Sequence, residues 1–323
     1  MNKVTKIRLS NSSIQDYLDC GWKFWRGHVQ GYKGEESDAL SFGGLFHQAM
    51  NYWFLGIPEE QVISKFVEAA NQSGLSTVMD DQKRSIAHGE LLLREYFNQY
   101  DHNPLRDYVV LSSEQKGDVI IYQDANLIIE YSYVIDKLLR KRTDDSVVIM
   151  DHKTSYTLGD AFGRATKPSS QFTGYIYCAR KHFRNESINE CVVDGIQTAR
   201  KKIETNPREC FTRISTYRTE QDLAEWLANT ISIGKRIARE VELDSWTFNT
   251  RSCTMYGQCP FYDVCLAPAQ DRERMLEVNY PVDEEHRLKV QTKTLDSTDQ
   301  LLELHKDMDK LEARFRNTNG GAR

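Results

Sequence analysis

The sequence contains the run "VVIMDHKTS" from Val147 to Ser155, in which apolar residues lead into charged ones. A short run of branched apolar residues of this kind predicts a buried strand. The strand ends in Asp151, His152 and Lys153. Buried charges are costly unless they are paired or bind a metal ion. We therefore expect other parts of the chain to bring partners to this end of the strand.

The strands before this one supply further carboxylates. β-Branched and aromatic residues gather in three stretches separated by polar turns, which predicts successive strands of one sheet at residues 109–122, 126–139 and 146–153. Strand side chains alternate between faces, so Asp151 and Lys153 share one face and His152 points to the other. Asp136 lies fifteen positions before Asp151, about the separation that sets two residues side by side on antiparallel neighbours. Glu114, one strand earlier, could join them.

Carboxylates crowded together repel each other unless a cation neutralises them. Mg²⁺ and Mn²⁺ prefer such oxygen ligands. A lysine beside the ion can position or deprotonate the attacking water, whose pKa the metal lowers. Together these groups predict hydrolysis of a phosphodiester. A structural salt bridge of Asp136 and Asp151 with Lys153 or nearby arginines is the plainer interpretation of these residues taken alone.

Length and composition describe a globular protein. The chain has 323 residues, 40% of them hydrophobic and 28% charged, and a net charge of −5, which argues against a general nucleic-acid coat but not against a nuclease. It contains no apolar run of membrane-spanning length and no signal peptide at its N-terminus. We therefore expect no membrane association and a location in the cytosol of a bacterium or of a phage-infected host.

Other segments predict an α/β protein with a helical N-terminal region. Periodic apolar residues predict helices at residues 41–56, 58–71, 81–100, 169–183, 219–243 and 297–316, and β-rich stretches predict strands at 190–200 and 209–218. We divide the chain into an N-terminal helical region (1–105), a catalytic core (106–245), a cysteine segment (246–270), and a linker with a C-terminal helix (271–323).

The seven cysteines fall into two groups. Cys178, Cys191 and Cys210 lie in predicted regular elements and are expected to be small buried hydrophobic residues. The other group contains a Cys-x5-Cys-x5-Cys run without helical or strand periodicity, and a fourth cysteine that is the only one in the N-terminal half: Cys20, Cys253, Cys259 and Cys265. Spaced thiols in a cytosolic loop suggest a metal. Zinc, an iron–sulfur cluster and unliganded thiols are the three alternatives.

These motifs resemble the PD-(D/E)XK nuclease superfamily, in particular its RecB-like branch. The resemblance is carried by "GGLFHQ" with Gly43 and His47, by "VIDKLL", by "IMDHKTS", and by "QFTGY" with Gln171 and Tyr175. It implies a restriction-endonuclease-like core, in which helices flank a mixed central β-sheet, and it covers about residues 10–265.

The resemblance also implies roles for individual residues. The metal ligands would be His47, Asp136, Asp151 and the backbone carbonyl of His152, with Glu114 as the loosest match. Lys153 would act on the water, and Asp151 and Asp136 would share in catalysis. Gln171 and Tyr175 would hold the DNA backbone or brace the site.

The cysteine pattern resembles that of AddB-type helicase–nucleases and CRISPR-associated exonucleases. In those families one cysteine precedes the histidine helix and three follow the nuclease core, with a terminal "CPF" segment such as Cys259–Phe261. This implies a structural 4Fe–4S cluster held by Cys20, Cys253, Cys259 and Cys265. In this sequence Gly21 stands where proline is usual, and the gap from Cys253 to Cys259 is longer than the common two-residue spacing.

The implied function is a metal-dependent DNA nuclease, an exonuclease on single-stranded DNA or DNA ends, in recombination, repair, replication or phage DNA processing. The sequence has no phosphate-binding G-x-x-x-x-G-K-[ST] motif, so any ATP-driven unwinding needs a partner such as a helicase or recombination protein. Two alternatives remain: a catalytically silent DNA-binding or scaffold subunit of a helicase–nuclease complex, and a different hydrolase or RNA-directed nuclease on the same fold.

Overall fold

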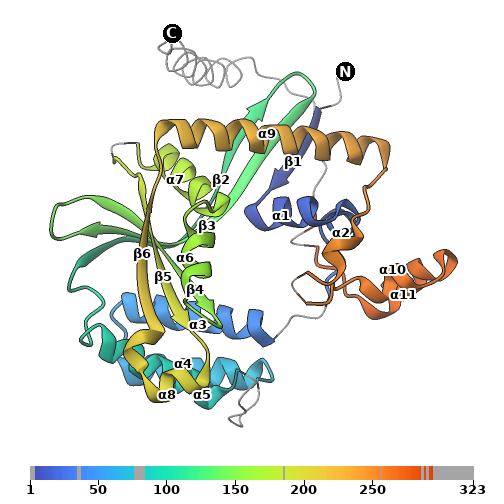
Figure 1. The fold of residues 1–323 in the computed structure, drawn as a ribbon. Helices are drawn as coiled ribbons and strands as arrows, with labels where there is room; N and C mark the ends of the chain where they lie inside the picture. Colours follow the sequence, from blue (N-terminus) through green and yellow to red (C-terminus); the bar gives the residue numbers. More distant parts are fainter. Residues whose placement is uncertain are drawn as a thin grey trace. The chain divides into compact units, whose positions relative to one another are not determined.

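The computed structural model describes residues 4–34, 38–75, 84–184, 186–255, 257–284, 287–288 and 291–293 (Figure 1). The chain forms two compact units. One contains residues 36–117 and 134–219 and is called here the core unit, and the other contains residues 1–35, 118–133 and 220–323 and is called the cysteine unit. The strands β2 (Tyr108–Gln123) and β3 (Leu127–Lys141) contribute residues to both.

Three helices form the first part of the core unit: α3 (Asp38–Phe54), α4 (Glu59–Gln72) and α5 (Ile86–Gln99). They confirm the predicted helices within a few residues. The starts of α4 and α5 have local causes. Glu59 and Glu60 place negative charge in the first turn of α4, where it interacts favourably with the helix dipole. The hydroxyl of Ser85 accepts a hydrogen bond from the backbone N–H of His88 and caps α5.

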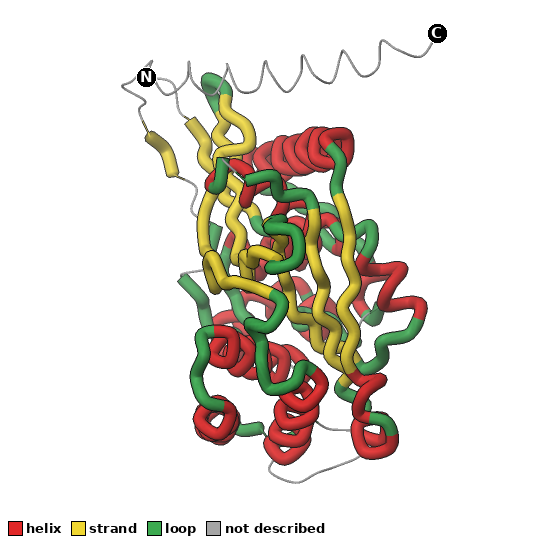
Figure 2. Tube along the Cα trace, turned by 90° about the vertical axis from the view of Figure 1, so that its left-hand side faces the viewer, coloured by secondary structure: helices red, strands yellow, loops and turns green. Residues whose placement is uncertain are grey.

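The sheet of the core unit has the order β6–β5–β4–β3. Its strands are the second part of β3, β4 (Val147–Ser155), β5 (Glu190–Gln197) and β6 (Phe211–Tyr217). Figure 2 shows strands, in yellow, running side by side. The pair β4–β5 is parallel, whereas β3–β4 and β5–β6 are antiparallel. A parallel pair needs a crossover, and here it contains α6 (Asp160–Thr166) and α7 (Ser170–His182). The core unit is thus a mixed sheet flanked by helices, as predicted.

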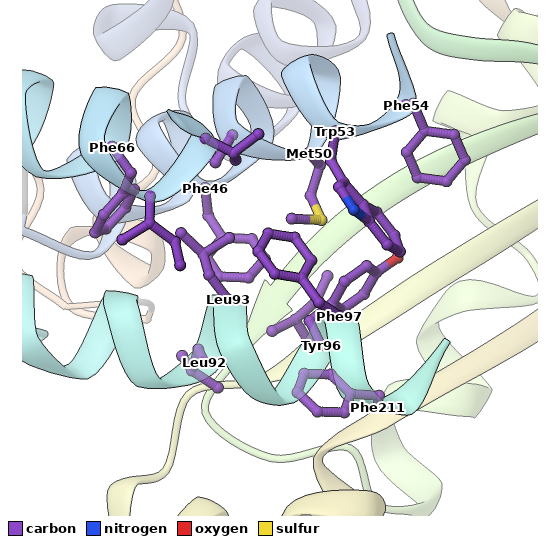
Figure 3. Close-up of a cluster of buried hydrophobic side chains, with 14 of the residues drawn as sticks. Phe46, Met50, Trp53, Phe54, Phe66, Leu92, Leu93, Tyr96, Phe97 and Phe211 are labelled. Atoms are coloured by element: carbon purple, nitrogen blue, oxygen red, sulfur yellow. The ribbon is translucent and has the colours of Figure 1, made fainter. Parts of the chain in front are cut away.

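The hydrophobic core lies between α3–α5 and one face of this sheet. Figure 3 shows Phe46, Met50 and Trp53 of α3 facing Leu93, Tyr96 and Phe97 of α5. The sheet contributes the residues on one face of β4 and β5, Val148, Met150, Val192 and Ile196. Full burial of each large apolar side chain contributes about 1.5–3 kcal/mol. This packing fixes α3 against the sheet, and α3 carries one of the predicted site residues.

The cysteine unit contains β1 (Val4–Leu9), which lies between β3 and β7 (Gln291–Lys293). Its pairing with β3 is parallel and sets Ile7 beside Ile129. Helix α9 (Glu220–Leu243) packs on these strands: a Cβ at Gly234 would come within 2.8 Å of Ile129. The remaining elements are α1 (Asn11–Asp19), α2 (Gly21–Phe24), a π-helical turn (Trp25–Val29), α10 (Tyr262–Leu266) and α11 (Arg272–Asn279).

The sequence analysis missed several elements. The strand β1 pairs with residues more than a hundred positions away, so no local turn indicates it. Short helices also went unpredicted: α6, α8 (Arg200–Thr205), α10, α11 and the 3₁₀ turns Pro207–Cys210, Thr250–Cys253 and Ala269–Asp271. The linker expected after residue 270 contains α11 and β7. The predicted helix 297–316 lies outside the described residues, and the four-part domain division stays a prediction.

Within the described ranges, no helix is both long enough and apolar enough to cross a membrane.

Candidate active site

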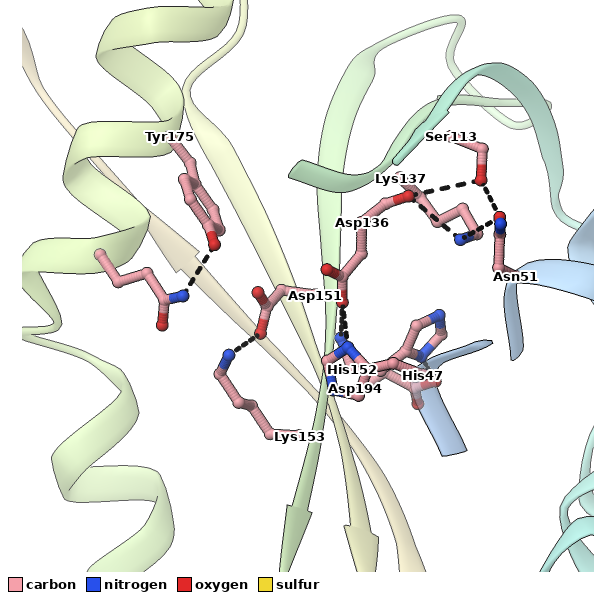
Figure 4. Close-up of polar contacts among 11 residues, drawn as sticks. His47, Asn51, Ser113, Asp136, Lys137, Asp151, His152, Lys153, Tyr175 and Asp194 are labelled. Carbon is pink, nitrogen blue, oxygen red and sulfur yellow. Dashed lines mark hydrogen bonds and ion pairs between the residues drawn. The ribbon is translucent and has the colours of Figure 1, made fainter. Parts of the chain in front are cut away.

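The antiparallel neighbours β3 and β4 bring two carboxylates together in their middle parts, as the fifteen-residue spacing predicts. The antiparallel register sets Lys137 opposite Met150, and continuing it by one residue sets Asp136 opposite Asp151. The backbone N–H of His152 donates a 2.9 Å hydrogen bond to Oδ2 of Asp136 (Figure 4). Both carboxylates are buried, Asp151 almost completely. The pair therefore lies where the buried part of β4, residues 147–152, is followed by partly exposed residues.

Helix α3 adds His47 to this pair. Its Nδ1 atom lies 3.2 Å from Oδ2 of Asp136. Burial alone would disfavour the protonated imidazole, but the hydrogen bond and the charge of Asp136 outweigh it and raise the pKa of His47. Burial likewise opposes the ionised form of Asp136, and the contact with His47 outweighs it and lowers the pKa of Asp136. The histidine predicted from the "GGLFHQ" motif thus contacts a predicted carboxylate.

Asp151 and Lys153 form an ion pair on one face of β4. The Nζ atom of Lys153 lies 2.9 Å from Oδ2 of Asp151. The other oxygen, Oδ1, is buried and has no hydrogen-bond partner among the described residues. Burial raises the pKa of Asp151; it opposes the charge of Lys153, yet the pKa of Lys153 is raised because Asp151 stabilises the ammonium. A buried carboxylate oxygen without a donor is a group that a cation would satisfy.

Glu114 has an unusual backbone conformation for a strand residue. Its φ of +50° lies in the left-handed region, which costs a non-glycine residue about 1–2 kcal/mol. The side chain is half-buried, and burial together with the negative charge of Asp136 raises its pKa. Strain of this kind is concentrated at functional sites. It supports Glu114 as a site residue, although the sequence motif around it matches only loosely.

The predicted residues of α7 contact each other. The Nε2 atom of Gln171 donates a 2.7 Å hydrogen bond to the hydroxyl of Tyr175, one helical turn later. Between them, the ring centroid of Phe172 lies 6.0 Å from Nζ of Lys153, so α7 covers the face of β4 that carries Lys153. Figure 4 shows Tyr175 on α7 in the same view as Asp151 and Lys153 of β4. The helix therefore borders the carboxylate pair.

A buried polar cluster that the sequence analysis did not identify lies on the opposite face of β4. Its centre is Asp194 of β5, which the parallel register sets beside His152. The carboxylate is fully buried and interacts with Nδ1 of His152 at 2.9 Å and with Nε of Arg213 at 3.3 Å. The hydroxyls of Tyr96 and Tyr100 donate hydrogen bonds to it as well. Burial opposes the charge of Asp194, but Arg213, His152 and Tyr96 together outweigh it and lower its pKa.

A sign of this cluster is present in the sequence. "ECVVDGIQ" places Asp194 in the middle of an apolar strand, as "VVIMDHK" does for Asp151, and a buried acid implies a partner. The sequence does not identify that partner, because the four contacting residues come from α5, its C-cap Tyr100, β4 and β6.

Lys137, the residue after Asp136, is a buried cation. Its Nζ atom donates to the backbone carbonyl of Asp136 at 3.0 Å and to Oδ1 of Asn51 at 3.1 Å. Ser113 donates to the same Asn51 oxygen. Burial lowers the pKa of Lys137. Asn51 follows His47 by one turn of α3, so this cluster and the His47–Asp136 contact share one helix face.

The cysteine unit brings the four predicted thiols to one small cavity. Its lining includes Cys20, Cys253, Cys259 and Cys265 together with Trp22 and Phe261. The backbone N–H of Cys259 donates to the carbonyl of Cys253 at 2.9 Å. Burial raises the pKa of Cys265 to about 12. In contrast, Cys178, Cys191 and Cys210 are fully buried, which confirms that they are hydrophobic core residues.

Neither group of residues is arranged as a metal site in the described part of the chain. No three His, Cys, Asp or Glu side chains there are placed so that they could hold a metal ion. The ligand atoms that the two groups offer are nevertheless of the types that such metal centres use. Asp136, Asp151 and His47 provide oxygen and nitrogen atoms beside the middle of β4, and the four thiols line one cavity. The metal ligands predicted from the sequence therefore remain predictions.

Comparison with known proteins identifies the class. The sequence profile of the PD-(D/E)XK nuclease superfamily matches residues 8–266, and the chain belongs to this family. Such nucleases typically use divalent metal ions. No curated protein sequence matches the chain significantly.

Two solved structures are similar at a low level. A candidate exonuclease from Eubacterium rectale is 14% identical, with a TM-score of 0.45, over 77% of this chain and 85% of its own. The protein SSO0001 is 11% identical, with a TM-score of 0.30, over 80% of this chain and 93% of its own. The family assignment rests on the profile match alone.

Proposed function

We propose that this protein is a nuclease that hydrolyses phosphodiester bonds in DNA with a bound Mg²⁺ or Mn²⁺ ion. The observation that carries the proposal is the arrangement around the middle of β4. Asp136 and Asp151 lie side by side, Lys153 is paired with Asp151, and one buried oxygen of Asp151 lacks a donor. Membership of the nuclease superfamily supports the same reaction.

Each residue of the site has a proposed role. Asp136, Asp151 and His47 would hold the ion, with the backbone carbonyl of His152 and the carboxylate of Glu114 as further ligands. A bound divalent cation supplies Lewis-acid activation of water and neutralises charge on the phosphate. The hydrogen bond from the N–H of His152 keeps the carboxylate of Asp136 oriented.

Lys153 would act directly on the reacting groups. Its ion pair with Asp151 raises its pKa and keeps it an ammonium, which has three N–H donors and no acceptor. In this state it can orient the attacking water and stabilise the negative phosphate, as the catalytic lysine of the site. Phe172 lies over its side chain on the α7 side.

We propose an exonuclease that acts on single-stranded DNA or on DNA ends. The contact between Gln171 and Tyr175 supports a bracing role beside Asp151 and Lys153, from which either side chain could also donate to the DNA backbone. Duplex unwinding would come from a helicase or another recombination protein, in recombination, repair, replication or phage DNA processing.

We further propose that Cys20, Cys253, Cys259 and Cys265 hold a 4Fe–4S cluster with a structural role. Two features support it: Cys20 lines the same cavity as three cysteines more than two hundred residues later, and no other cysteine does so. Metal binding that exists only in the folded state adds to stability. A cluster here would cross-link the two ends of the cysteine unit.

The test is a cleavage assay on anaerobically purified protein. End-labelled single-stranded DNA, duplex DNA and single-stranded RNA are each incubated with Mg²⁺, Mn²⁺ or EDTA. We expect metal-dependent loss of DNA, and a product ladder that gives the direction of digestion. Asp151→Asn should abolish it, because losing a stabilisation of several kcal/mol corresponds to about a thousand-fold in rate.

The matched control is Asp160→Asn, which changes an exposed acid at the start of α6. It should cleave like the wild type. Retained cleavage in Asp151→Asn would overturn the site assignment. A folded wild type that binds DNA without cutting it would instead indicate a catalytically silent subunit. If the protein degrades RNA but not DNA, its substrate is RNA.

A further inference from the structure

An open groove lies in the core unit beside the candidate active site. It is a cavity of about 610 Å³ between the end of α3 and the first part of β2. The side chains that matter for its chemistry are Asn51, Leu55, Val109, Leu111, Ser113 and Arg142. None of them has a role in the reaction proposed above, so the groove requires its own explanation.

The groove begins at the candidate active site. On α3, His47 and Asn51 are four residues apart and share one helix face. Leu55 lies in the turn directly after the helix, and its N–H still donates a helical hydrogen bond to the carbonyl of Asn51. At 1.5 Å per residue, Asn51 lies about 6 Å and Leu55 about 12 Å along the axis from His47. On β2, Ser113 precedes Glu114, and its hydroxyl lies 3.5 Å from the backbone carbonyl of Asp136. Figure 4 shows Asn51, Ser113 and Lys137 next to Asp136.

The length of the groove matches a few nucleotides. Val109 lies five residues before Glu114, which is about 16 Å along a strand at 3.3 Å per residue. Successive nucleotides of a stacked DNA strand are spaced by about 3.4 Å. A strand whose phosphate is held by the proposed metal ion at Asp136 and Asp151 would therefore place about four or five further nucleotides along the groove.

The surface of the groove is apolar, with one positive charge. Leu55 is 57% exposed, and Val109 and Leu111 are 39% exposed each, on alternate residues of one strand face. Exposed apolar side chains that gather in one place mark a binding surface, whereas isolated ones do not. Arg142 is the charged side chain of the lining. This combination suits a single strand, which offers base faces for apolar contact and phosphates for a cation.

A duplex suits the groove less well. Its bases are stacked inside the helix, and it presents its phosphates along the outside, so proteins bind it mainly through many cationic contacts. Apolar residues would gain little from that surface. We propose that this groove binds single-stranded DNA next to the scissile phosphate, with bases against Leu55 and Leu111 and a phosphate against Arg142. This inference rests on the proposed nuclease function and specifies its substrate.

The test measures binding separately from cleavage. The full-length chain carries Asp151→Asn to prevent cutting, and fluorescence anisotropy follows a labelled oligothymidylate and a labelled blunt duplex. Leu55→Ser with Leu111→Ser should weaken binding of the oligothymidylate about ten-fold, which corresponds to about 1.4 kcal/mol, because both apolar contacts with the bases are lost. Duplex binding should change much less. Arg142→Gln should reduce the slope of log affinity against log salt by about 0.7, the value for one phosphate contact on a single strand.

Two leucines outside the groove provide the control. Leu243 and Leu266 are 55% and 68% exposed and belong to the cysteine unit. Their change to serine should leave both affinities unaltered. Unchanged oligothymidylate binding in the groove variant would overturn the proposal, as would an equal loss for both substrates. If the wild type cuts DNA and the groove variant binds as before, the groove proposal is wrong and the nuclease proposal stands. If the wild type does not cut DNA but binds single strands through the groove, the nuclease proposal is wrong and the groove proposal stands.

Discussion

The Nδ1 atom of His152 lies 2.9 Å from Oδ2 of Asp194, and both side chains are completely buried. The backbone N–H of the same histidine donates to Asp136 on β3. His152 therefore fixes β4 to a neighbour on each side, through its side chain to β5 and through its peptide to β3. Asp151 and Lys153 are its sequence neighbours and project from the opposite face. Their position follows from this double attachment, which makes Asp194 a positioning residue of the site.

Loss of Asp194 should destabilise the fold strongly. Asp194→Ala leaves Arg213 and the two tyrosine hydroxyls without their buried acceptor, and breaking a buried pair costs about 3–5 kcal/mol. Asp194→Asn keeps one oxygen acceptor and should cost less. Urea unfolding measures both.

A suitable control is Asp118→Ala, which removes an exposed ion pair with Arg8. Exposed pairs contribute about 0–1 kcal/mol. If Asp194→Ala and Asp118→Ala lowered the free energy of unfolding equally, the buried cluster would have no anchoring role.

Lys153→Met should separate chemistry from metal binding. The variant keeps the carboxylates of Asp136 and Asp151, so calorimetric titration with Mn²⁺ should give an affinity near that of the wild type. Cleavage should fall by about 10²–10⁴-fold, the usual contribution of a group that transfers or positions a proton. Lys167→Met, at an exposed lysine after α6, should change neither quantity. Loss of Mn²⁺ binding in Lys153→Met would show that the lysine is needed to form the site.

Substitutions at Glu114 should slow cleavage, and their effect on stability should depend on whether the new residue has a Cβ atom. The left-handed φ of +50° costs a residue with a Cβ about 1–2 kcal/mol, which glycine does not pay. Glu114→Gly should therefore unfold at a higher urea concentration than Glu114→Ala, while both cleave more slowly than the wild type. Equal stability of the two variants would show that the backbone here is not strained. Unimpaired cleavage in both would exclude Glu114 from the ligand set.

The hairpin of β3 and β4 could be predicted from the sequence because its geometry is local. A short turn links the strands, so the spacing between Asp136 and Asp151 determines the register, and the alternation of side chains gives the faces of Asp151 and Lys153. The helix α3 was predicted by its apolar periodicity. The contact of His47 with Asp136 came from a resemblance in motif, since nothing in the spacing of the two residues indicates it.

Contacts that depend on distant pairing could not be predicted. The neighbour of His152 is Asp194 only because a crossover of two helices sets β5 parallel to β4 in one register. The strand β1 is fixed in the same way, by residues 127–131. Tyr96 and Arg213 reach Asp194 from α5 and β6, so no single segment contains the pattern. The apolar groove depends in turn on the packing of α3 against β2, which periodicity alone does not specify.

Cys20→Ala should remove the visible absorbance of an iron–sulfur cluster and lower the stability of anaerobically purified protein. The thiol lines the cavity formed with Cys253, Cys259 and Cys265, and a metal centre bound only in the folded state stabilises that state. Cys178→Ala is the matched control, because this thiol is fully buried in the core unit and away from the cavity. It should keep the wild-type spectrum and lose only packing energy. Metal analysis distinguishes four irons from one zinc. A brown and stable Cys20→Ala protein would remove Cys20 from the ligand set, since a cluster that depends on this thiol cannot survive its loss unchanged.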